Sequence, residues 1–486
     1  MAEWLPEATI EEMQEKMEKG ELSSHDLVLM YQARIAAFDK ITNSVLELNP
    51  DALHIAAALD AERKQKGTRG PLHGIPVLVK DNIDTNDKMH TSAGSLALKD
   101  SFAQKDSFVA AKLKEAGAVI LGKTNMTEWA NFMANNMKSG YSSRGGQVLN
   151  PYGPGKFDVG GSSAGSGAAI AANLAAVAVG TETDGSILNP SSKNSLAGIK
   201  PTVGLVSRSG IIPIAHTQDT AGPMARTVKD AVYLLEAIVG QDPQDPATMV
   251  SLPEFSHDSL FDEHALKGAK IAVVREEYIG KWTQEQEQIF QKAVETMKEL
   301  GAEIVEAEIP AAKATWGYKV LSYEFKADLN AYLNGLPANI PVRTLADVIA
   351  FNYEHGDKML NYGQEVLLES EATSGTLTEA EYLEELEYNL YMAREQGIDY
   401  ALKEYGADAV LFPMDGSTIG SKAGYPSVTV PTAFTEDGEP VGITFSGTAF
   451  SEPLLIRLAY AYEQATNVRR APELRINAEE KIHTTS

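Results

Sequence analysis

The chain is long, acidic and free of cysteine. Its 486 residues are 43% hydrophobic, and 42 basic against 67 acidic residues give a formal net charge of −25. This balance disfavours nucleic acid as a partner, because phosphate binding relies on clustered lysine and arginine. The absence of cysteine excludes disulfides, thiolate metal sites and a cysteine nucleophile. The chain can therefore bury a large core, and any nucleophilic chemistry must use another side chain.

Neither the N-terminus nor any apolar run indicates export or a membrane span. The first residues lack the basic start and the apolar stretch of a signal peptide. The longest apolar run, 168–179, is interrupted by Asn173 and is shorter than the about 20 residues that a membrane helix needs. We therefore expect a cytoplasmic protein with no membrane partner.

Helices are expected before residue 70. Thr9 followed by Glu12 is a capping-box signature, with methionines at helical spacing behind it. A second helix is expected to begin near Ser23 or Ser24, where apolar residues recur with the helical period. We expect residues 1–70 to form an N-terminal helical segment that packs on the core.

Strands and helices alternate in the rest of the chain, which indicates an α/β domain. A buried strand is expected at 75–79, directly before Lys80, and a helix at 108–115 leads to a strand at 118–121. We expect one catalytic domain over residues 71–486, with a variable helical section at about 284–405. The other expected strands lie at 269–274, 409–412, 427–431 and 441–445, and the other expected helices at 164–178, 284–300, 378–405 and 454–465.

Residues 140–225 are rich in small and polar residues and poor in charge. So much glycine and serine indicates a built site where backbone comes close to a ligand. The segment GSSAG at 161–165 fits a Gly-x-Ser-x-Gly nucleophile elbow with Ser163 as nucleophile. That interpretation needs a histidine later in the chain, and His216, His257, His264 and His355 lie in no evident motif.

Cofactor and metal motifs give no match in the sequence. The Gly-Lys-Ser/Thr ending of a phosphate loop does not follow the glycines that precede the expected helix. The nine histidines include no His-x-x-x-His pair beside a carboxylate. We therefore expect neither a cofactor nor a metal.

A longer pattern resembles the amidase-signature family, from about residue 20 to the C-terminal helix. The family's fold implies a single large α/β domain in which helices cover both faces of a central mixed β-sheet. The motifs that carry the resemblance are GIPVLVKD (74–81), GGSSAGSG (160–167), GTETDGSILNP (180–190), GIKPT (198–202), GYPSVTVP (424–431) and PVG (440–442).

The resemblance also implies roles for individual residues. The family's nucleophile falls on Ser186, its bridging serine on Ser162 and its lysine base on Lys80. In the family a peptide bond next to the residue matching Gly161 or Ser162 is cis. The implied oxyanion hole is made by the backbone N–H groups of Thr183, Asp184, Gly185 and Ser186.

These residue types suit hydrolysis of an amide through an acyl-enzyme. A serine hydroxyl is a poor nucleophile until a base removes its proton. Lysine can be that base only when neutral, and burial after an apolar strand lowers its pKa in the required direction. Lys123 follows a strand at similar spacing, but the family assigns the base to Lys80. Trp129, Phe132 and Met133 are candidates to line the substrate pocket.

One departure from the family narrows the expected substrate. Many members read Gly-Gly-Ser-Ile-Arg at the nucleophile, whereas this chain reads DGSIL at 184–188. The change resembles the branch of bacterial peptide amidases, so we expect a free-standing amidase for small-molecule or short-peptide amides, including peptide C-terminal amides. The alternatives are a subunit of an amidotransferase that acts on misacylated transfer RNA, and a catalytically idle binding protein. The oligomeric state stays open.

Overall fold

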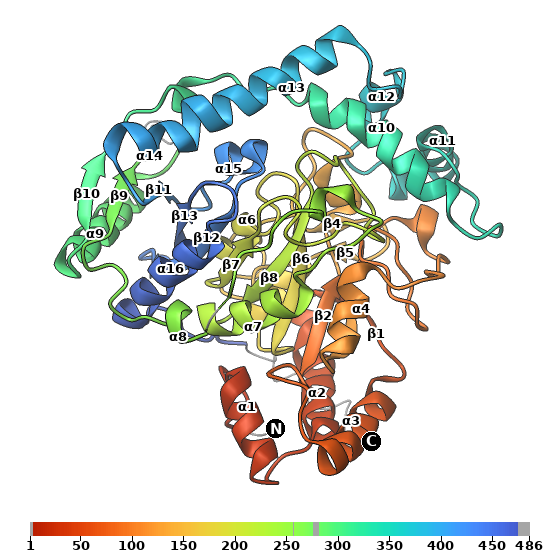
Figure 1. Ribbon diagram of the computed structural model, residues 1–486. Helices are drawn as coiled ribbons and strands as arrows, with labels where there is room; N and C mark the ends of the chain where they lie inside the picture. The colour runs from red at the N-terminus through yellow and green to blue at the C-terminus, as the bar shows by residue number, and fades with distance from the viewer. Residues whose placement is uncertain (1–2, 256, 276–280, 475–486) are drawn as a thin grey trace.

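The chain folds around one large mixed β-sheet (Figure 1). The computed structural model describes residues 3–255, 257–275 and 281–474. Within these residues eleven strands form the main sheet, in the order β1-β3-β2-β6-β8-β7-β12-β13-β11-β9-β10, and β4 and β5 form a small separate sheet. The strands are β1 Val45–Leu48, β2 Pro76–Lys80, β3 Val119–Thr124, β4 Tyr141–Ser142, β5 Gly146–Gln147, β6 Val177–Glu182, β7 Ala197–Lys200, β8 Thr220–Ala225, β9 Lys270–Val273, β10 Glu303–Glu306, β11 Ala409–Pro413, β12 Ser427–Phe434 and β13 Pro440–Ser446.

The parallel strands β2 and β6 create the position of the site. β2 runs between β3 and β6, parallel to both. Parallel neighbours end at the same edge of a sheet, and ligands of α/β proteins bind outside the carboxyl ends of such strands. Lys80 is the last residue of β2 and Glu182 the last residue of β6. The topology therefore brings two segments about one hundred residues apart to one edge of the sheet.

Helices cover both faces of the sheet, as the α/β fold class predicts (Figure 1). α4, α7 and α16 form one connected group, while α5 and α6 contact each other and the central strands. The helices are α1 Ile10–Glu18, α2 Ser24–Thr42, α3 Ala52–Lys66, α4 Phe108–Glu115, α5 Ala164–Ala171, α6 Leu188–Lys193, α7 Val228–Ile238, α8 His257–Leu260, α9 Gln284–Glu299, α10 Lys319–Asn334, α11 Leu345–His355, α12 Glu365–Glu371, α13 Ala380–Ala393, α14 Asp399–Tyr405, α15 Thr418–Ala423 and α16 Glu452–Thr466.

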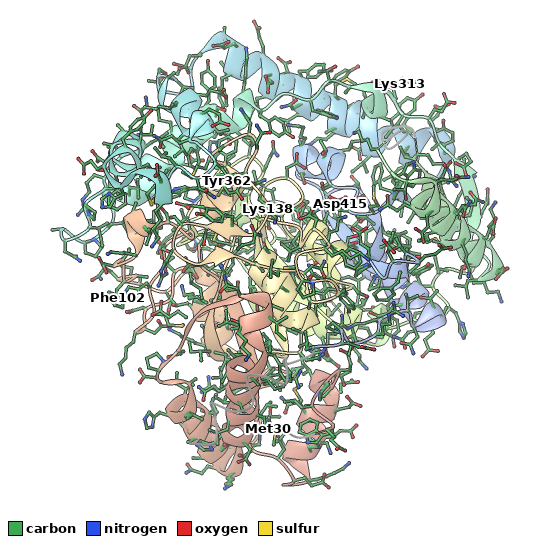
Figure 2. All side chains as sticks on the ribbon, turned by 180° about the vertical axis from the view of Figure 1, so that it is seen from behind. Met30, Phe102, Lys138, Lys313, Tyr362 and Asp415 are labelled. Carbon is green, nitrogen blue, oxygen red and sulfur yellow. The ribbon has the colours of Figure 1, made fainter. Side chains whose placement is uncertain are left out.

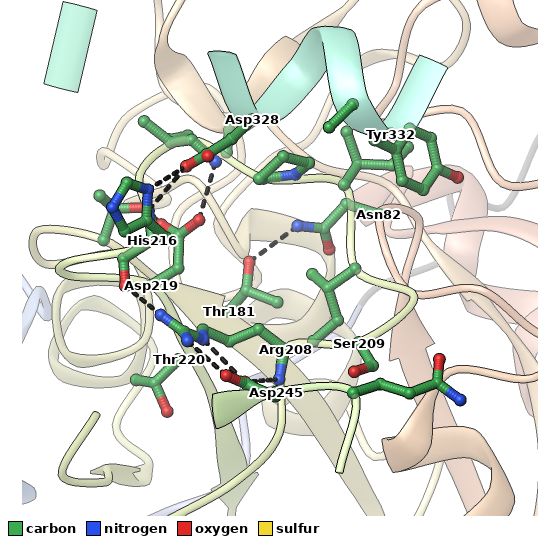
Figure 3. Close-up of a pocket in the computed structure, with 18 of the residues that line it drawn as sticks. Asn82, Thr181, Arg208, Ser209, His216, Asp219, Thr220, Asp245, Asp328 and Tyr332 are labelled. Atoms are coloured by element: carbon green, nitrogen blue, oxygen red, sulfur yellow. Dashed lines mark hydrogen bonds and ion pairs between the residues drawn. The ribbon is translucent and has the colours of Figure 1, made fainter. Parts of the chain in front are cut away.

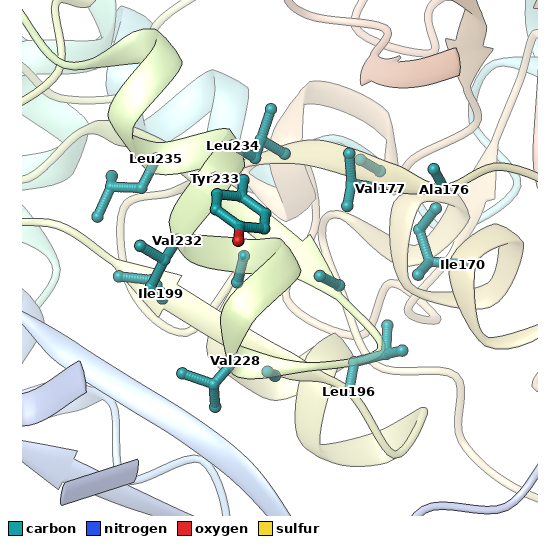
Figure 4. Close-up of a cluster of buried hydrophobic side chains, with 14 of the residues drawn as sticks. Ile170, Ala176, Val177, Leu196, Ile199, Val228, Val232, Tyr233, Leu234 and Leu235 are labelled. Atoms are coloured by element: carbon teal, nitrogen blue, oxygen red, sulfur yellow. The ribbon is translucent and has the colours of Figure 1, made fainter. Parts of the chain in front are cut away.

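Aliphatic side chains of α7 pack on the centre of the sheet (Figure 4). Val228, Val232 and Leu235 of α7 are fully buried, as are Val177 of β6 and Ile199 of β7. Each such side chain contributes about 1.5–3 kcal/mol through its burial. The strand that leads to the nucleophile motif is therefore anchored in the main hydrophobic core.

Most expected elements lie near their predicted bounds. The capping box of Thr9 and Glu12 begins α1, and Ser23 caps α2. The helix expected at 108–115 is α4, and the strand expected at 75–79 is β2, which is buried along its whole length. These predictions are confirmed, and each depends on a local signal such as a helix cap or a short apolar run.

The helix expected at 164–178 is wrong in its second half. α5 ends at Ala171, and β6 begins at Val177. Between them Asn173 has a φ of 58°, and its side chain accepts from the Glu7 N–H and donates to the Glu7 carboxylate. A run of alanine and valine carries no period that separates a helix from a buried strand, so the pattern does not show where the helix ends.

The section at about 284–405 contributes an arch of helices at one end of the molecule (Figure 1). Figure 2 shows Lys313 on this arch and Met30 on the N-terminal helices at the opposite end. The section also contains β10, a strand that the sequence pattern does not predict. The single helix expected at 378–405 is wrong, because the backbone leaves helical geometry at Gly397 and separates α13 from α14.

The domain boundaries stay predictions. The N-terminal segment supplies an edge strand to the main sheet, since β1 pairs with β3. Within the described ranges, no helix combines the length and the apolar composition that crossing a membrane requires.

Candidate active site

Lys80 is buried at the carboxyl end of β2. Its side chain is fully buried, and its Nζ lies 2.8 Å from Ser162 Oγ and 2.9 Å from Thr181 Oγ1. Burial lowers the pKa of Lys80 to about 7, while the negative charges of Asp219 and Glu182 limit the shift. A substantial fraction of this lysine is therefore neutral near pH 7, as a general base must be.

Ser162 lies in the turn that leads into α5. It is fully buried, and the peptide bond between Gly161 and Ser162 is cis. The turn approaches other backbone closely, because a Cβ at Gly165 would collide with the carbonyl oxygens of Asn125 and Ser44. Only glycine fits there, which explains one glycine of the motif and the position of the turn against Lys80.

The neighbouring serines take part in structural contacts. Ser163 Oγ donates to the Thr181 carbonyl oxygen at 3.1 Å and accepts from the Thr181 N–H at 3.2 Å. Ser166 Oγ lies 2.8 Å from Thr124 Oγ1. Both serines are fully buried. This geometry gives no support to Ser163 as the nucleophile of a Gly-x-Ser-x-Gly elbow.

Ser186 follows a sharp turn after β6. Gly185 has a φ of 80°, a left-handed conformation that glycine adopts without strain. Among the described residues, no hydrogen bond uses the N–H of Thr183, Asp184 or Ser186 as donor, whereas the Gly185 N–H faces the Glu182 carboxylate. Ser186 Oγ likewise has no hydrogen-bond partner in the described part of the chain. The turn therefore offers free backbone donors beside a free hydroxyl.

Glu182 holds the far side of this turn. Its Oε2 accepts from the N–H groups of Ile187 at 2.7 Å and Leu188 at 2.9 Å, and its Oε1 accepts from Ser421 Oγ at 3.1 Å. Burial raises the pKa of Glu182, while Lys200 and the N–H donors act in the opposite direction. The carboxylate thus fixes the start of α6, and with it the position of Ser186.

A cavity of about 550 Å³ opens in front of Ser186. Phe132, Tyr318 and Leu321 line it together with the nucleophile turn. Trp129 and Met133, the other expected pocket residues, are each 2% exposed and belong to the adjoining hydrophobic cluster. Of the three candidates only Phe132 lines this cavity.

A second cavity of about 380 Å³ adjoins the first and shares Ala130, Thr183 and Ile214 with it (Figure 3). It reaches the partners of Lys80, since Thr181 and Asn82 line it and Asn82 Nδ2 donates to Thr181 Oγ1 at 3.0 Å. Charged residues also line this cavity, including the ion pair of Arg208 with Asp245 (Figure 3).

One cluster in the second cavity has the residue types of a metal site. His216 Nδ1 lies 2.8 Å from an Asp328 carboxylate oxygen and 3.6 Å from a Glu324 carboxylate oxygen. These groups already take part in hydrogen bonds, since Glu324 also accepts from Thr217 and Tyr382. The spacing of these residues in the sequence does not reveal the cluster, and we assign it no metal.

Lys123 does not contact the two serines. Its Nζ donates to the Ile83 carbonyl oxygen at 2.5 Å and to Thr91 Oγ1 at 2.8 Å. Asp81 accepts from the Gly94 N–H and from Arg144, so Asp81 and Lys123 both stabilise the loop that follows β2. Of the two lysines compared in the sequence, Lys80 is therefore the one placed against Ser162.

Sequence reasoning assigned no role to three residues that shape the site: Thr181, Glu182 and Asp219. Thr181 and Glu182 lie inside the nucleophile motif, and a carboxylate in a region so poor in charge is a signal that could have marked Glu182. Asp219 has no such signal, because it reaches Thr183 only through the fold.

The chain is similar to known proteins over nearly its whole length. The family model described as Amidase matches residues 26–456. A "probable amidase" of Arabidopsis thaliana is 42% identical, over 96% of this chain and 92% of the relative. The crystal structure of a peptide amidase from Stenotrophomonas maltophilia superposes with a TM-score of 0.89 at 44% identity, over 97% of this chain and 99% of that one. A glutamyl-tRNA(Gln) amidotransferase subunit of Geobacter metallireducens is 33% identical, over 94% of this chain and 97% of the relative.

The mixed sheet, its helical layers and these relatives define an enzyme that hydrolyses amide bonds. The chain belongs to the amidase-signature family.

Proposed function

We propose that this enzyme is a free-standing serine amidase that uses Ser186 as nucleophile, Ser162 as proton relay and Lys80 as base. The observation that carries the proposal is the 2.8 Å contact between Lys80 Nζ and Ser162 Oγ, fully buried beside the cavity that contains Ser186. The turn containing Ser186 lies next to Ser162, since the Ser163 N–H donates to the Ser186 carbonyl oxygen at 3.2 Å.

Acylation begins when Ser186 Oγ attacks the carbonyl carbon of the amide. Its proton passes to Ser162 Oγ, whose own proton passes to neutral Lys80, as a hydroxyl can donate and accept at once. Ser186 Oγ has no partner among the described residues in the free enzyme, so the relay requires it to approach Ser162 Oγ when substrate binds.

Collapse of the tetrahedral intermediate breaks the carbon–nitrogen bond. The proton returns from Lys80 through Ser162 to the leaving nitrogen, which departs as ammonia from a primary amide. Water then attacks the acyl group on Ser186 with the same relay, and the carboxylic acid is released as the serine is restored.

The nucleophile turn stabilises the oxyanion in this proposal. Backbone donors aimed at the developing negative charge are each worth about 3–4 kcal/mol in such sites. The unengaged N–H groups of Thr183, Asp184 and Ser186 suit this role. The Gly185 N–H can join them only by leaving the Glu182 carboxylate.

The proposed substrates are short-peptide amides, including the C-terminal amide of peptides. The support is the likeness to the Stenotrophomonas maltophilia peptide amidase over nearly the whole chain, together with a cavity large enough for more than a simple aliphatic amide. Apolar side chains of Phe132, Leu321 and Val366 line that cavity and can pack against an acyl side chain.

Labelling with a fluorophosphonate probe tests the nucleophile. We expect the native enzyme to be labelled and Ser186→Ala to remain unlabelled, because the probe reacts with an activated serine. Ser163→Ala is the matched control and should keep the label. Equal labelling of native enzyme and Ser186→Ala would refute the assignment. A panel of peptide amides, aliphatic amides and aryl anilides, followed by release of ammonia or amine, then identifies the substrate class.

A role within an amidotransferase complex is the second candidate, favoured by the 33% identity to the amidotransferase subunit of Geobacter metallireducens. The DGSIL segment weighs against it, because Leu188 occupies the position at which many family members have an arginine. Free-standing hydrolysis of peptide amides by the purified chain, without a partner, would decide against this candidate.

A further inference from the structure

Asp219 lies behind the nucleophile turn, in the loop before β8. It lines the second cavity and not the cavity of Ser186. Its Oδ2 accepts from the N–H groups of Ile214 at 2.8 Å and Ala215 at 2.9 Å. Its Oδ1 accepts from Thr183 Oγ1 at 2.5 Å. Two backbone donors therefore fix the carboxylate, and the carboxylate in turn holds Thr183.

Thr183 is held from two sides by this loop. Its hydroxyl donates to Asp219, and its carbonyl oxygen accepts from Gln218 Nε2 at 3.0 Å. Both contacts leave the Thr183 N–H unengaged among the described residues. The loop thus orients the peptide unit that begins the nucleophile turn. A fixed orientation is what the free Thr183 N–H needs if it is to donate to the oxyanion without rearranging.

The charge of Asp219 also acts on the lysine. The charged groups that face Lys80 are Asp219 and Glu182, and both act to raise the pKa of Lys80 against its burial. Asp219 itself faces Arg208 and Asp328 across the second cavity. Burial raises the pKa of Asp219 to about 6, so it carries a negative charge at pH 7 and above.

We propose that Asp219 is a positioning residue for amide hydrolysis, because it fixes Thr183 at the start of the nucleophile turn. The inference rests on the proposed function of Lys80 and Ser186. Asp219 lines the second cavity, and Thr183 lines both cavities, so the inference connects the second cavity to the nucleophile turn.

Two variants test the contact from its two ends. Thr183→Val keeps the carboxyl group of Asp219 and removes the hydroxyl that donates to it. We expect kcat to fall about tenfold, the worth of a hydrogen bond to a charged group. Thr183→Ser keeps the hydroxyl and should recover most of the loss. Asp219→Asn should also lower kcat, because it removes the charged group to which that hydroxyl donates.

Asp328→Asn is the matched control, since it removes a carboxylate from the same cavity and has no contact with Thr183. We expect it to leave kcat unchanged, and thermal unfolding of all variants checks that they are folded. A native kcat in Thr183→Val or in Asp219→Asn would overturn the inference. The proposed function fails separately, if the native enzyme is not labelled on Ser186.

Discussion

Two groups of residues around the Ser186 cavity are built in different ways. The first, called the floor, is the nucleophile turn with Ser186, which lines the cavity, together with residues buried behind it at the ends of β2 and β6 and in the adjoining turn: Lys80, Ser162, Thr181 and Glu182. The second, called the helical wall, comes from α10, α12 and Tyr318, which directly precedes α10 and has an exposed fraction of 58%. The floor is held by the core of the sheet, so we expect changes in the wall to affect substrate choice more than the chemistry.

Ser186→Ala tests the floor with the largest expected effect. Removal of the nucleophile should lower kcat for a peptide amide by on the order of 10⁴- to 10⁶-fold, as in other serine hydrolases. Ser322→Ala is the control, because Ser322 lines the same cavity from α10. It should change the rate little, and a comparable loss in Ser322→Ala would erase the distinction between floor and wall.

Lys80→Met and Lys123→Met compare two fully buried lysines whose pKa values burial lowers. Lys80→Met should lower kcat by about 10²- to 10⁴-fold, because it removes the general base. In the native enzyme, activity should rise with pH through about 7, since Lys80 is protonated and inactive below its pKa. Lys123→Met should lower thermal stability but keep this acid limb. Persistence of the limb in Lys80→Met would remove the lysine from the mechanism.

Glu182→Gln probes the support of the floor. Both carboxylate oxygens of Glu182 accept hydrogen bonds, one from the N–H groups of Ile187 and Leu188 and the other from the Ser421 hydroxyl. A glutamine has only one acceptor oxygen and cannot replace both. We expect kcat to fall about tenfold with a smaller change in KM. Glu452→Gln is the control. Glu452 begins α16, is an equally buried carboxylate and accepts from the Thr202 N–H. Equal losses of kcat in the two variants would indicate a general effect on stability.

Tyr318→Ala tests the wall, with the smallest expected effect. Loss of an exposed aromatic contact should lower kcat/KM about two- to tenfold. The loss should vary with the acyl side chain, and the acid limb should stay in place. Tyr353→Ala removes an equally exposed tyrosine that does not line the cavity and should have no effect. A moved acid limb in Tyr318→Ala would show that the wall is coupled to the floor.

Three residues of the floor were expected from the sequence because the motifs that resemble the amidase-signature family are long. Lys80, Ser162 and Ser186 each lie in such a motif, and the resemblance implied both their common site and their roles, which stay predictions. Thr181 and Glu182 lie inside one of these motifs, but nothing in the pattern singled them out.

The wall and the second cavity were not predictable in this way. Phe132 lines the cavity while Trp129 and Met133 are buried behind it, and all three have the apolar character of either position. Asp219 reaches Thr183 across 36 positions of sequence, and no local pattern marks such a contact. The helix expected at 164–178 is wrong in its second half because a run of alanine and valine has no period that separates a helix from a buried strand.

Mass spectrometry of enzyme quenched during turnover of a peptide amide tests the central claim most directly. We expect a mass increase equal to the acyl group, mapped to the peptide that contains Ser186 and lost in Ser186→Ala. An acyl adduct on Ser163 or on another residue, or steady turnover with no covalent adduct at any quench time under conditions that accumulate the adduct of a known serine amidase, would contradict the mechanism.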